Sequence, residues 1–293
     1  MRRVMGGTAG PVLVVLLALL IVWYAAAIPM NSLWQSTLYE RAGTTNVPLT
    51  QYLADVWSQA KPVLPAPHQI AQEVWANTAG QALDSKRSFL YHAGITLSAT
   101  VLGFIIGTAL GLGLAVLIIH NEAMNRSLMP WIIASQTIPI LAIAPMLVVG
   151  LNAVGLTGIV PKALISTYLS FFPVVVGMVK GLRSPDQMQL DLMRTYNATR
   201  LQIFAKLRWP AAMPFLFASM KVGIAIALIG ALVAELTNTA AGGLGVRLLT
   251  GSYNGQTITI WGVLFVAAAL AAVLVIAVSL SERLVMRAMG QPT

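Results

Sequence analysis

The sequence predicts an all-α integral membrane protein with about six transmembrane helices, from its composition, its long apolar segments and the positions of its basic residues. Of 293 residues, 57% are hydrophobic and 9% are charged, whereas roughly a quarter of a soluble domain is charged. A helix needs about 20 apolar residues to cross the hydrocarbon core. Six segments meet this length: 11–28, 92–119, 128–151, 156–179, 211–236 and 258–280. No alternating strand pattern is present, so helices must satisfy the backbone within the bilayer.

The distribution of Lys and Arg between the spans predicts their orientation. With the N-terminus inside, the inner segments contain Arg2, Arg3, Arg126, Lys180, Arg183, Arg194, Arg200, Lys206, Arg208, Arg283 and Arg287. The outer segments then contain Arg41, Lys61, Lys86, Arg87 and Arg247. We therefore expect both termini to be cytoplasmic. The net charge of +9 then reflects topology, and nucleic acid is not an expected partner.

The first span and the outer segment after it each have two interpretations. Basic residues, an apolar run and the alanines at 25–27 resemble a secretory signal peptide. The run is longer than a usual signal h-region, which favours an N-terminal transmembrane helix over 1–28. The outer segment 29–91 is either a cap lying on the membrane or a surface for an external partner. Its tryptophans favour the cap for at least part of it. A five-helix core is expected over 92–285.

Glycines in the second span form a smooth stripe at four-residue spacing. Gly103, Gly107 and Gly111 lie on one helical face, where another backbone can approach closely. The stripe predicts either tight helix packing within one chain, which we favour, or a dimer interface.

The third and fourth spans combine prolines with polar residues. Prolines at 130, 139, 145, 161 and 173 predict bends, which a membrane protein tolerates where the freed carbonyls meet protein or water. Any one of the polar side chains nearby can simply join helices, but together they indicate a solute path. With one lysine from the fifth span, the residues assigned to this path are Gln136, Thr137, Ser166, Tyr168 and Lys221.

Charges inside the spans are costly and usually functional. Lys162 and Lys221 lie near enough to span ends to extend their ammonium groups to an interface. Glu235 lies at the outer end of the fifth span, where we expect it at the membrane interface. The spans lack the acidic series of a proton relay, which disfavours a proton-driven carrier.

No enzymatic or metal chemistry is indicated. The chain has no cysteine, and its three histidines are scattered without metal-ligand spacing. It contains no GxxxxGK[ST] phosphate loop and no catalytic cluster, so we expect no bound cofactor and no ATP hydrolysis.

The segment DLMRTYNATRLQIFAKLRWP, residues 191–210, is a basic amphipathic pattern between the fourth and fifth spans. Its periodicity predicts two short helices joined at Asn197, a residue type that tolerates left-handed backbone, with Pro210 closing the loop or starting the next helix. Spacing alone leaves two interpretations open, a helix on anionic lipid or a helix docked in a groove of a cytoplasmic protein.

The same segment resembles the EAA loop of permease subunits of ATP-binding-cassette (ABC) importers. Asp191, Leu192 and Met193 stand at the EAA positions, Asn197 at the glycine, and Pro210 at the closing proline. The flanking sequences NATRLQIFAKLRWPAAMP, ALIGALVAEL and GGLG also resemble this family. PAPHQIAQEVW is similar to the entry to the second span in its nitrate, sulfonate, taurine and bicarbonate branch. The two alanines of EAA are absent, and the outer segment 30–64 is an extension.

The resemblance implies a type I ABC-importer permease fold, with a cytoplasmic coupling loop at 183–210, in the bacterial cytoplasmic (inner) membrane. It implies that the chain forms a pathway for a small solute. The branch of the family indicates an organic or inorganic anion. Expected partners are a cytoplasmic ATPase dimer that binds ATP, a second permease subunit, an extracytoplasmic solute-binding protein and membrane lipid. The residues expected to contact the ATPase are Asp191, Tyr196, Asn197, Leu201, Phe204 and Pro210. The alternative is a stand-alone channel or ion-coupled carrier whose loop binds lipid.

Overall fold

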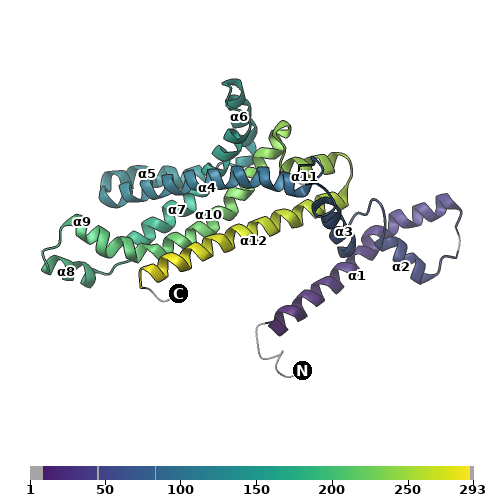
Figure 1. Cartoon of the computed structure of the whole chain (residues 1–293), viewed down its shortest axis with the longest axis horizontal. Helices are drawn as coiled ribbons and strands as arrows, with labels where there is room; N and C mark the ends of the chain where they lie inside the picture. The colour runs from purple at the N-terminus through teal and green to yellow at the C-terminus, as the bar shows by residue number, and fades with distance from the viewer. Residues whose placement is uncertain (1–8, 45, 83, 291–293) are drawn as a thin grey trace. The chain divides into compact units, whose positions relative to one another are not determined.

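The computed structural model describes residues 9–44, 46–82 and 84–290, and within these ranges every regular element is helical (Figure 1). The basic pair Arg2 and Arg3 lies outside the described residues. The longer helices are α1 (Ala9–Ala42), α4 (Phe89–His120), α7 (Ile159–Leu182), α10 (Trp209–Thr237) and α12 (Thr257–Ala288). The shorter ones are α2 (Leu49–Trp57), α3 (Pro67–Thr78), α5 (Glu122–Ser135), α6 (Ile140–Ala153), α8 (Gln187–Thr195), α9 (Arg200–Ile203) and α11 (Leu244–Tyr253).

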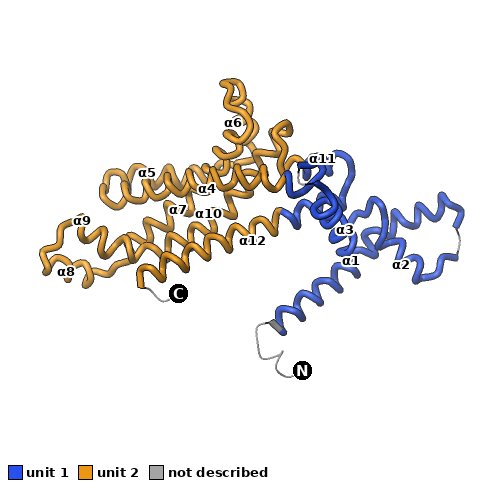
Figure 2. Tube along the Cα trace, in the orientation of Figure 1, with its two compact units in different colours: residues 1–91, 247–266 blue, residues 92–246, 267–293 orange. Residues whose placement is uncertain are grey.

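Five of the described helices are long and apolar enough to cross a membrane, and the number rises to six if the bent pair α5 and α6 counts as one span. The expected class, an all-helical membrane protein with about six spans, is therefore confirmed. The chain divides into two compact units (Figure 2). Unit 1 contains residues 1–91 and 247–266, and unit 2 contains residues 92–246 and 267–293. The stretch 247–266, which the sequence placed in the core, thus belongs to unit 1.

In unit 1, α1 does not end near 28 as expected but continues through Pro29 to Ala42. The extension is held by Asn31, which is fully buried. Its side-chain amide donates to the carbonyls of Val56 (3.3 Å) and Leu64 (2.9 Å), and its oxygen accepts the Val63 N–H at 2.9 Å. A buried amide with all these partners fixes α2 and the following loop against α1, because leaving any of them unpaired is costly.

In unit 2, the glycine stripe of α4 packs on α7 of the same chain. A Cβ on Gly103 or Gly107 would collide with Ser166 or Ser170, and one on Gly111 would lie 2.8 Å from the Val174 side chain. Because glycine has no side chain, the two backbones can approach closely, as they do at small residues between membrane helices. Packing within one chain, the favoured interpretation, is the use the structure shows.

The expected third span is not one continuous helix. It is broken between α5 and α6, whose axes differ by 96°, and α6 turns away from α5 (Figure 1). Pro139 is the residue before α6 and has extended backbone (φ −64°, ψ 114°). Proline lacks an N–H and restricts the residue before it, so a helix readily stops there. Residues of α6 then pack on α7 and α10 in a small apolar cluster of Ala144, Val148, Ile165, Val233 and Ala234.

The segment 187–210 lies at one end of the unit 2 bundle (Figure 1). Asn197 joins α8 to α9 with φ 54°, in the left-handed region expected for it. The second short helix is not separate, because α9 runs through a π-helical turn, Phe204–Arg208, directly into α10. Pro210 lies in the first turn of α10. The wide turn just before it accommodates a residue that cannot donate and whose ring crowds the preceding turn.

Candidate functional site

Four residues expected in the solute path come from the break in the third span and from α7. Gln136 and Thr137 are exposed at the break. The Tyr168 hydroxyl donates to the Ser135 carbonyl, which ties α7 to the end of α5. Ser166 is buried against the glycines of α4 and α10, and its hydroxyl has no hydrogen-bond partner in the described part of the chain. The structure therefore places three of the four at the break and the fourth inside the bundle.

Lys221, the fifth of these residues, pairs with another helix. Its Nζ lies 2.5 Å from Glu282 Oε2 on α12, with 34% and 24% of the two side chains exposed. Its charge is thus matched within unit 2.

Lys162 and Glu235 form a buried ion pair, which corrects the expectation that each reaches an interface. Lys162 Nζ lies 3.4 Å from Glu235 Oε1, and the side chains are 1% and 0% exposed. Lys162 also donates to the Gly242 carbonyl at 2.6 Å. An ammonium this deep in the bundle is stabilised by the carboxylate and carbonyl around it, because unpaired burial would be prohibitive.

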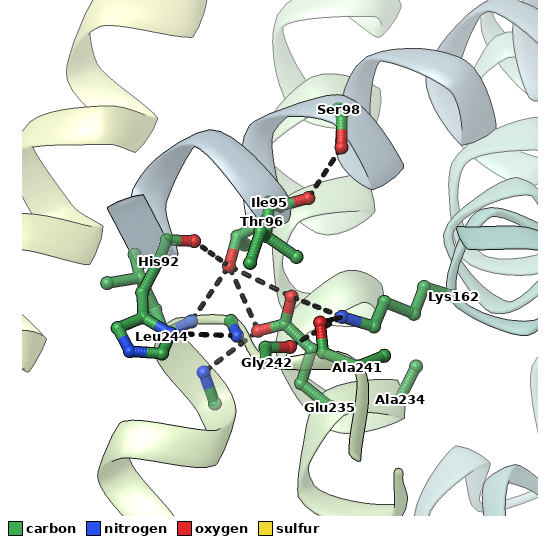
Figure 3. Close-up of polar contacts among 12 residues, drawn as sticks. His92, Ile95, Thr96, Ser98, Lys162, Ala234, Glu235, Ala241, Gly242 and Leu244 are labelled. Carbon is green, nitrogen blue, oxygen red and sulfur yellow. Dashed lines mark hydrogen bonds and ion pairs between the residues drawn. The ribbon is translucent and has the colours of Figure 1, made fainter. Parts of the chain in front are cut away.

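The pair belongs to a network that holds the loop after α10 to three helices (Figure 3). The Gly245 N–H donates to Glu235 Oε2 at 2.9 Å, and the Gly243 N–H donates to His92 Nδ1 at 3.0 Å. Thr96 Oγ1 accepts the Leu244 N–H and donates toward the Glu235 carboxylate, both at 2.9 Å. The backbone of four successive residues, two at the end of the loop and the first two of α11 (242–245), is thereby fixed by side chains of α4, α7 and α10.

Glycine is required in this loop for two reasons. Gly242 and Gly243 have φ of 67° and 126°, where side chains are strained. A Cβ on Gly243 would also collide with the carboxylate of Glu235. The run GGLG in the sequence is therefore explained by its approach to a buried acid.

The amphipathic helix α8 exposes an apolar face. Met188, Leu192, Tyr196 and, on α9, Leu201 are 81%, 56%, 77% and 74% exposed. An apolar face of this extent on a short helix is typical of a docking surface. Asp191 lies on the same helix and pairs with Arg194 at 2.9 Å through largely exposed side chains.

Of the remaining residues of the expected coupling set, Phe204 and Pro210 are half-buried, whereas Asn197 is exposed. Phe204 packs between His120 and Trp209, with ring centroids 5.0 and 5.8 Å apart, and it borders the largest apolar cluster of unit 2. Asn197 makes the turn and Pro210 lies in the first turn of α10. Tyr196 and Leu201 are thus available to a partner, whereas Phe204 fixes the segment to the bundle.

Sequence reasoning missed the loop network of His92, Thr96 and residues 242–245. It considered Lys162 and Glu235 one at a time. Two opposite charges inside apolar spans, with a glycine run beside one of them, were the available signal for a buried pair.

The spans, the break lined by polar groups and the exposed apolar helix at one end together define a polytopic helical membrane protein. Residues 93–291 match the family described as binding-protein-dependent transport system inner membrane component, and the chain belongs to this family. It is the ABC-importer permease family of the resemblance, in which ATPase activity lies in a separate subunit. Its members typically bind no cofactor.

Several proteins are similar to this chain. A probable ABC transporter permease of Haemophilus influenzae is 30% identical over 192 residues, covering 66% of this chain and 74% of that protein. The riboflavin transport system permease RibX of Chloroflexus aurantiacus is 29% identical, with 77% and 80% covered. The putative aliphatic sulfonates permease SsuC of Bacillus subtilis is 27% identical, with 57% and 58% covered. In fold, the chain is similar to a chain of the inward-facing MetNI methionine ABC transporter, with a TM-score of 0.59, 20% identity, and 67% and 95% covered.

Proposed function

We propose that this permease forms the solute pathway of an ATP-driven importer and is driven by a cytoplasmic ATPase dimer docked on α8 and α9. The observation that carries the proposal is the exposed apolar face of Met188, Leu192, Tyr196 and Leu201. Family membership supplies the transport class, and likeness to the MetNI fold supports an ATPase as the occupant of this face.

Movement of the docked face would reach the spans through rigid contacts. Phe204 packs on His120 at the end of α4, and the π-helical turn continues into α10. Because α9 and α10 are continuous, a displacement of the docked segment is passed directly to a membrane-spanning helix. This is consistent with alternating access by rigid-body movement of helices.

The orientation follows from charge. Residues 187–210, the docking segment, contain Arg194, Arg200, Lys206 and Arg208. An excess of basic residues favours the cytoplasmic side. We place both termini and this segment in the cytoplasm and the chain in a bacterial inner membrane. A second permease subunit, an extracytoplasmic binding protein and membrane lipid complete the proposed assembly.

The proposed substrate is a small solute, an anion in the first instance. One relative is named as a sulfonate permease, which supports an anion. Another is named as a riboflavin permease, which supports a wider class of solutes. The buried Lys162 does not supply a cation for an anion, since Glu235 already matches its charge. Binding of candidate solutes to the cognate binding protein decides between these classes.

Co-purification tests the coupling. The chain is co-expressed with its partner ATPase, and Tyr196→Ser/Leu201→Ser is compared with the unchanged protein. Loss of apolar contact at two exposed positions should reduce ATPase association at least tenfold, since each buried side chain contributes about 1.5–3 kcal/mol. Thermal unfolding should be unchanged because neither residue is packed on the chain.

Met124→Ser is the matched control, a 40% exposed apolar residue of α5 outside the docking segment. It should leave association intact. Full ATPase association and full transport in Tyr196→Ser/Leu201→Ser would instead favour a stand-alone channel or carrier.

A further inference from the structure

A basic cavity lies behind the docking segment of unit 2. It has a volume of about 490 Å³ and is lined by residues of α8, α9, the π-helical turn and the end of α4. Its charged lining residues are Arg194, Arg200 and Arg208, joined by His120, and the described lining contains no carboxylate. Three guanidinium groups, of which only Arg194 pairs with an acid, create a site for an anion.

The cations keep most of their hydrogen-bonding capacity. Arg208 donates one weak bond to the Leu182 carbonyl at 3.5 Å. Arg194 pairs with Asp191 through exposed side chains, an interaction that contributes little and exchanges readily. Within the described chain, Arg200 has no ion-pair partner. Guanidinium forks bind carboxylate and phosphate oxygens in pairs, and a phosphate has enough oxygens to engage more than one fork, which a halide cannot do.

The cavity lies on the opposite side of α8 from the apolar docking face. Leu190 and Arg194, four residues apart, line the cavity. Met188 and Leu192 are exposed on the other face. Residues at i and i+4 share a helix face, and an offset of two residues turns by roughly 200°. An occupant of the cavity therefore leaves the docking face uncovered.

The position of the cavity favours a lipid as its occupant. His120 is the last residue of α4, a candidate membrane span, so the cavity lies where a span ends. Beside the arginines, its lining includes the apolar side chains of Ile119, Leu190 and Phe204. A phosphate flanked by apolar groups matches the headgroup boundary of a phospholipid, and anionic leaflets attract basic segments at this depth.

We propose that this cavity binds a phosphate group, supplied by the headgroup of an anionic phospholipid, and thereby positions α8 and α9 from behind. His120 Nδ1 donates to the Val116 carbonyl at 2.8 Å, which leaves its Nε2 as the ring atom that can face the ligand. The binding depends on unit 2 alone and not on the ATPase contact proposed above.

Native mass spectrometry of the purified full chain tests the site, with dioleoyl phosphatidylglycerol compared with dioleoyl phosphatidylcholine. One phosphatidylglycerol should bind about tenfold more tightly than phosphatidylcholine, and Arg194→Gln/Arg200→Gln should abolish that preference, since charge-assisted hydrogen bonds carry it. Both arginines are exposed, so the variant should fold, which its gel-filtration profile verifies.

Arg183→Gln is the matched control, an exposed arginine at the end of α7 that does not line the cavity. It should keep the preference, as should Leu201→Ser, whose side chain belongs to the docking face. Equal binding of the two lipids, or an unchanged preference in Arg194→Gln/Arg200→Gln, would overturn the site. Displacement of phosphatidylglycerol by inorganic phosphate at matched ionic strength would overturn the lipid as its source. Lipid binding lost in Leu201→Ser would overturn the separation of the two faces.

Discussion

Lys162 and Glu235, 73 positions apart in the chain, place their charges 3.4 Å apart with both side chains buried. The pair does more than neutralise two charges, because Lys162 also binds the loop backbone at Gly242 and Glu235 the backbone at the start of α11, at Gly245. The end of α10, the following loop and α7 are therefore held as one structure. The stability of unit 2 therefore depends on two charged residues whose burial in an isolated membrane span would be unfavourable.

Glu235→Ala should destabilise the protein strongly. It leaves the Lys162 ammonium buried without a counter-charge and also removes the acceptor of Gly245, a loss of roughly 3–5 kcal/mol. The midpoint of thermal unfolding in detergent measures it. Glu122→Ala, which removes an exposed pair with Arg126, should change stability by less than about 1 kcal/mol. Equal small shifts in both variants would show that the buried pair does not stabilise the fold.

Gly243→Ala should be costlier than alanine at another left-handed glycine. Both a strained φ of 126° and a collision with the Glu235 carboxylate oppose it, together roughly 2–5 kcal/mol. Gly155→Ala is the matched control, with φ 79° and open space around its Cβ, so only the backbone cost of about 1–2 kcal/mol applies. Thermal unfolding of the two variants side by side isolates the contact. Similar shifts would contradict the close approach of loop and acid.

Phe204→Ala should reduce stability, whereas Leu201→Ala should not. Phe204 packs on His120 and Trp209, so its truncation should cost roughly 2–3 kcal/mol, below the range for a fully buried ring. Leu201 is 74% exposed, so Leu201→Ala should weaken ATPase association without changing stability. Unfolding and co-purification measured on both variants separate the anchor from the contact. A stable Phe204→Ala protein that fails to bind the ATPase would place Phe204 in the contact instead.

Gly107→Ala should weaken the packing of α4 on α7. The added methyl would meet the Ser170 hydroxyl and lie 3.1 Å from the Thr167 carbonyl oxygen, an overpacking cost of roughly 1–3 kcal/mol. Gly113→Ala, in the same helix with nothing within 4 Å, should be neutral or stabilise by up to about 1 kcal/mol. The difference between their unfolding midpoints is the measurement. A neutral Gly107→Ala would contradict close helix contact at this position.

The helical membrane class, most of the span positions and the amphipathic segment were predictable because they depend on local patterns. The break before Pro139 was not, since a proline inside an apolar run is compatible with a kinked helix or with two helices. The merger of α9 with α10 was also hidden, because the π-helical turn that accommodates Pro210 leaves no signature in hydrophobic spacing. Of the expected coupling residues, the pattern could not separate exposed Leu201 from packed Phe204, which stand three positions apart on one predicted stripe.

By itself, the sequence determined that this chain belongs in a bilayer and resembles an importer permease. Apolar length, charge placement and motif spacing depend only on the order of residues along the chain. Tertiary structure alone decided that Lys162 and Glu235 are partners, that Thr96, 139 positions from the acid, completes their network, and that the arginines of the docking segment enclose one cavity. Those relationships join residues on different helices. Their distances follow from how closely the helices pack, a property of the folded bundle that no single segment carries.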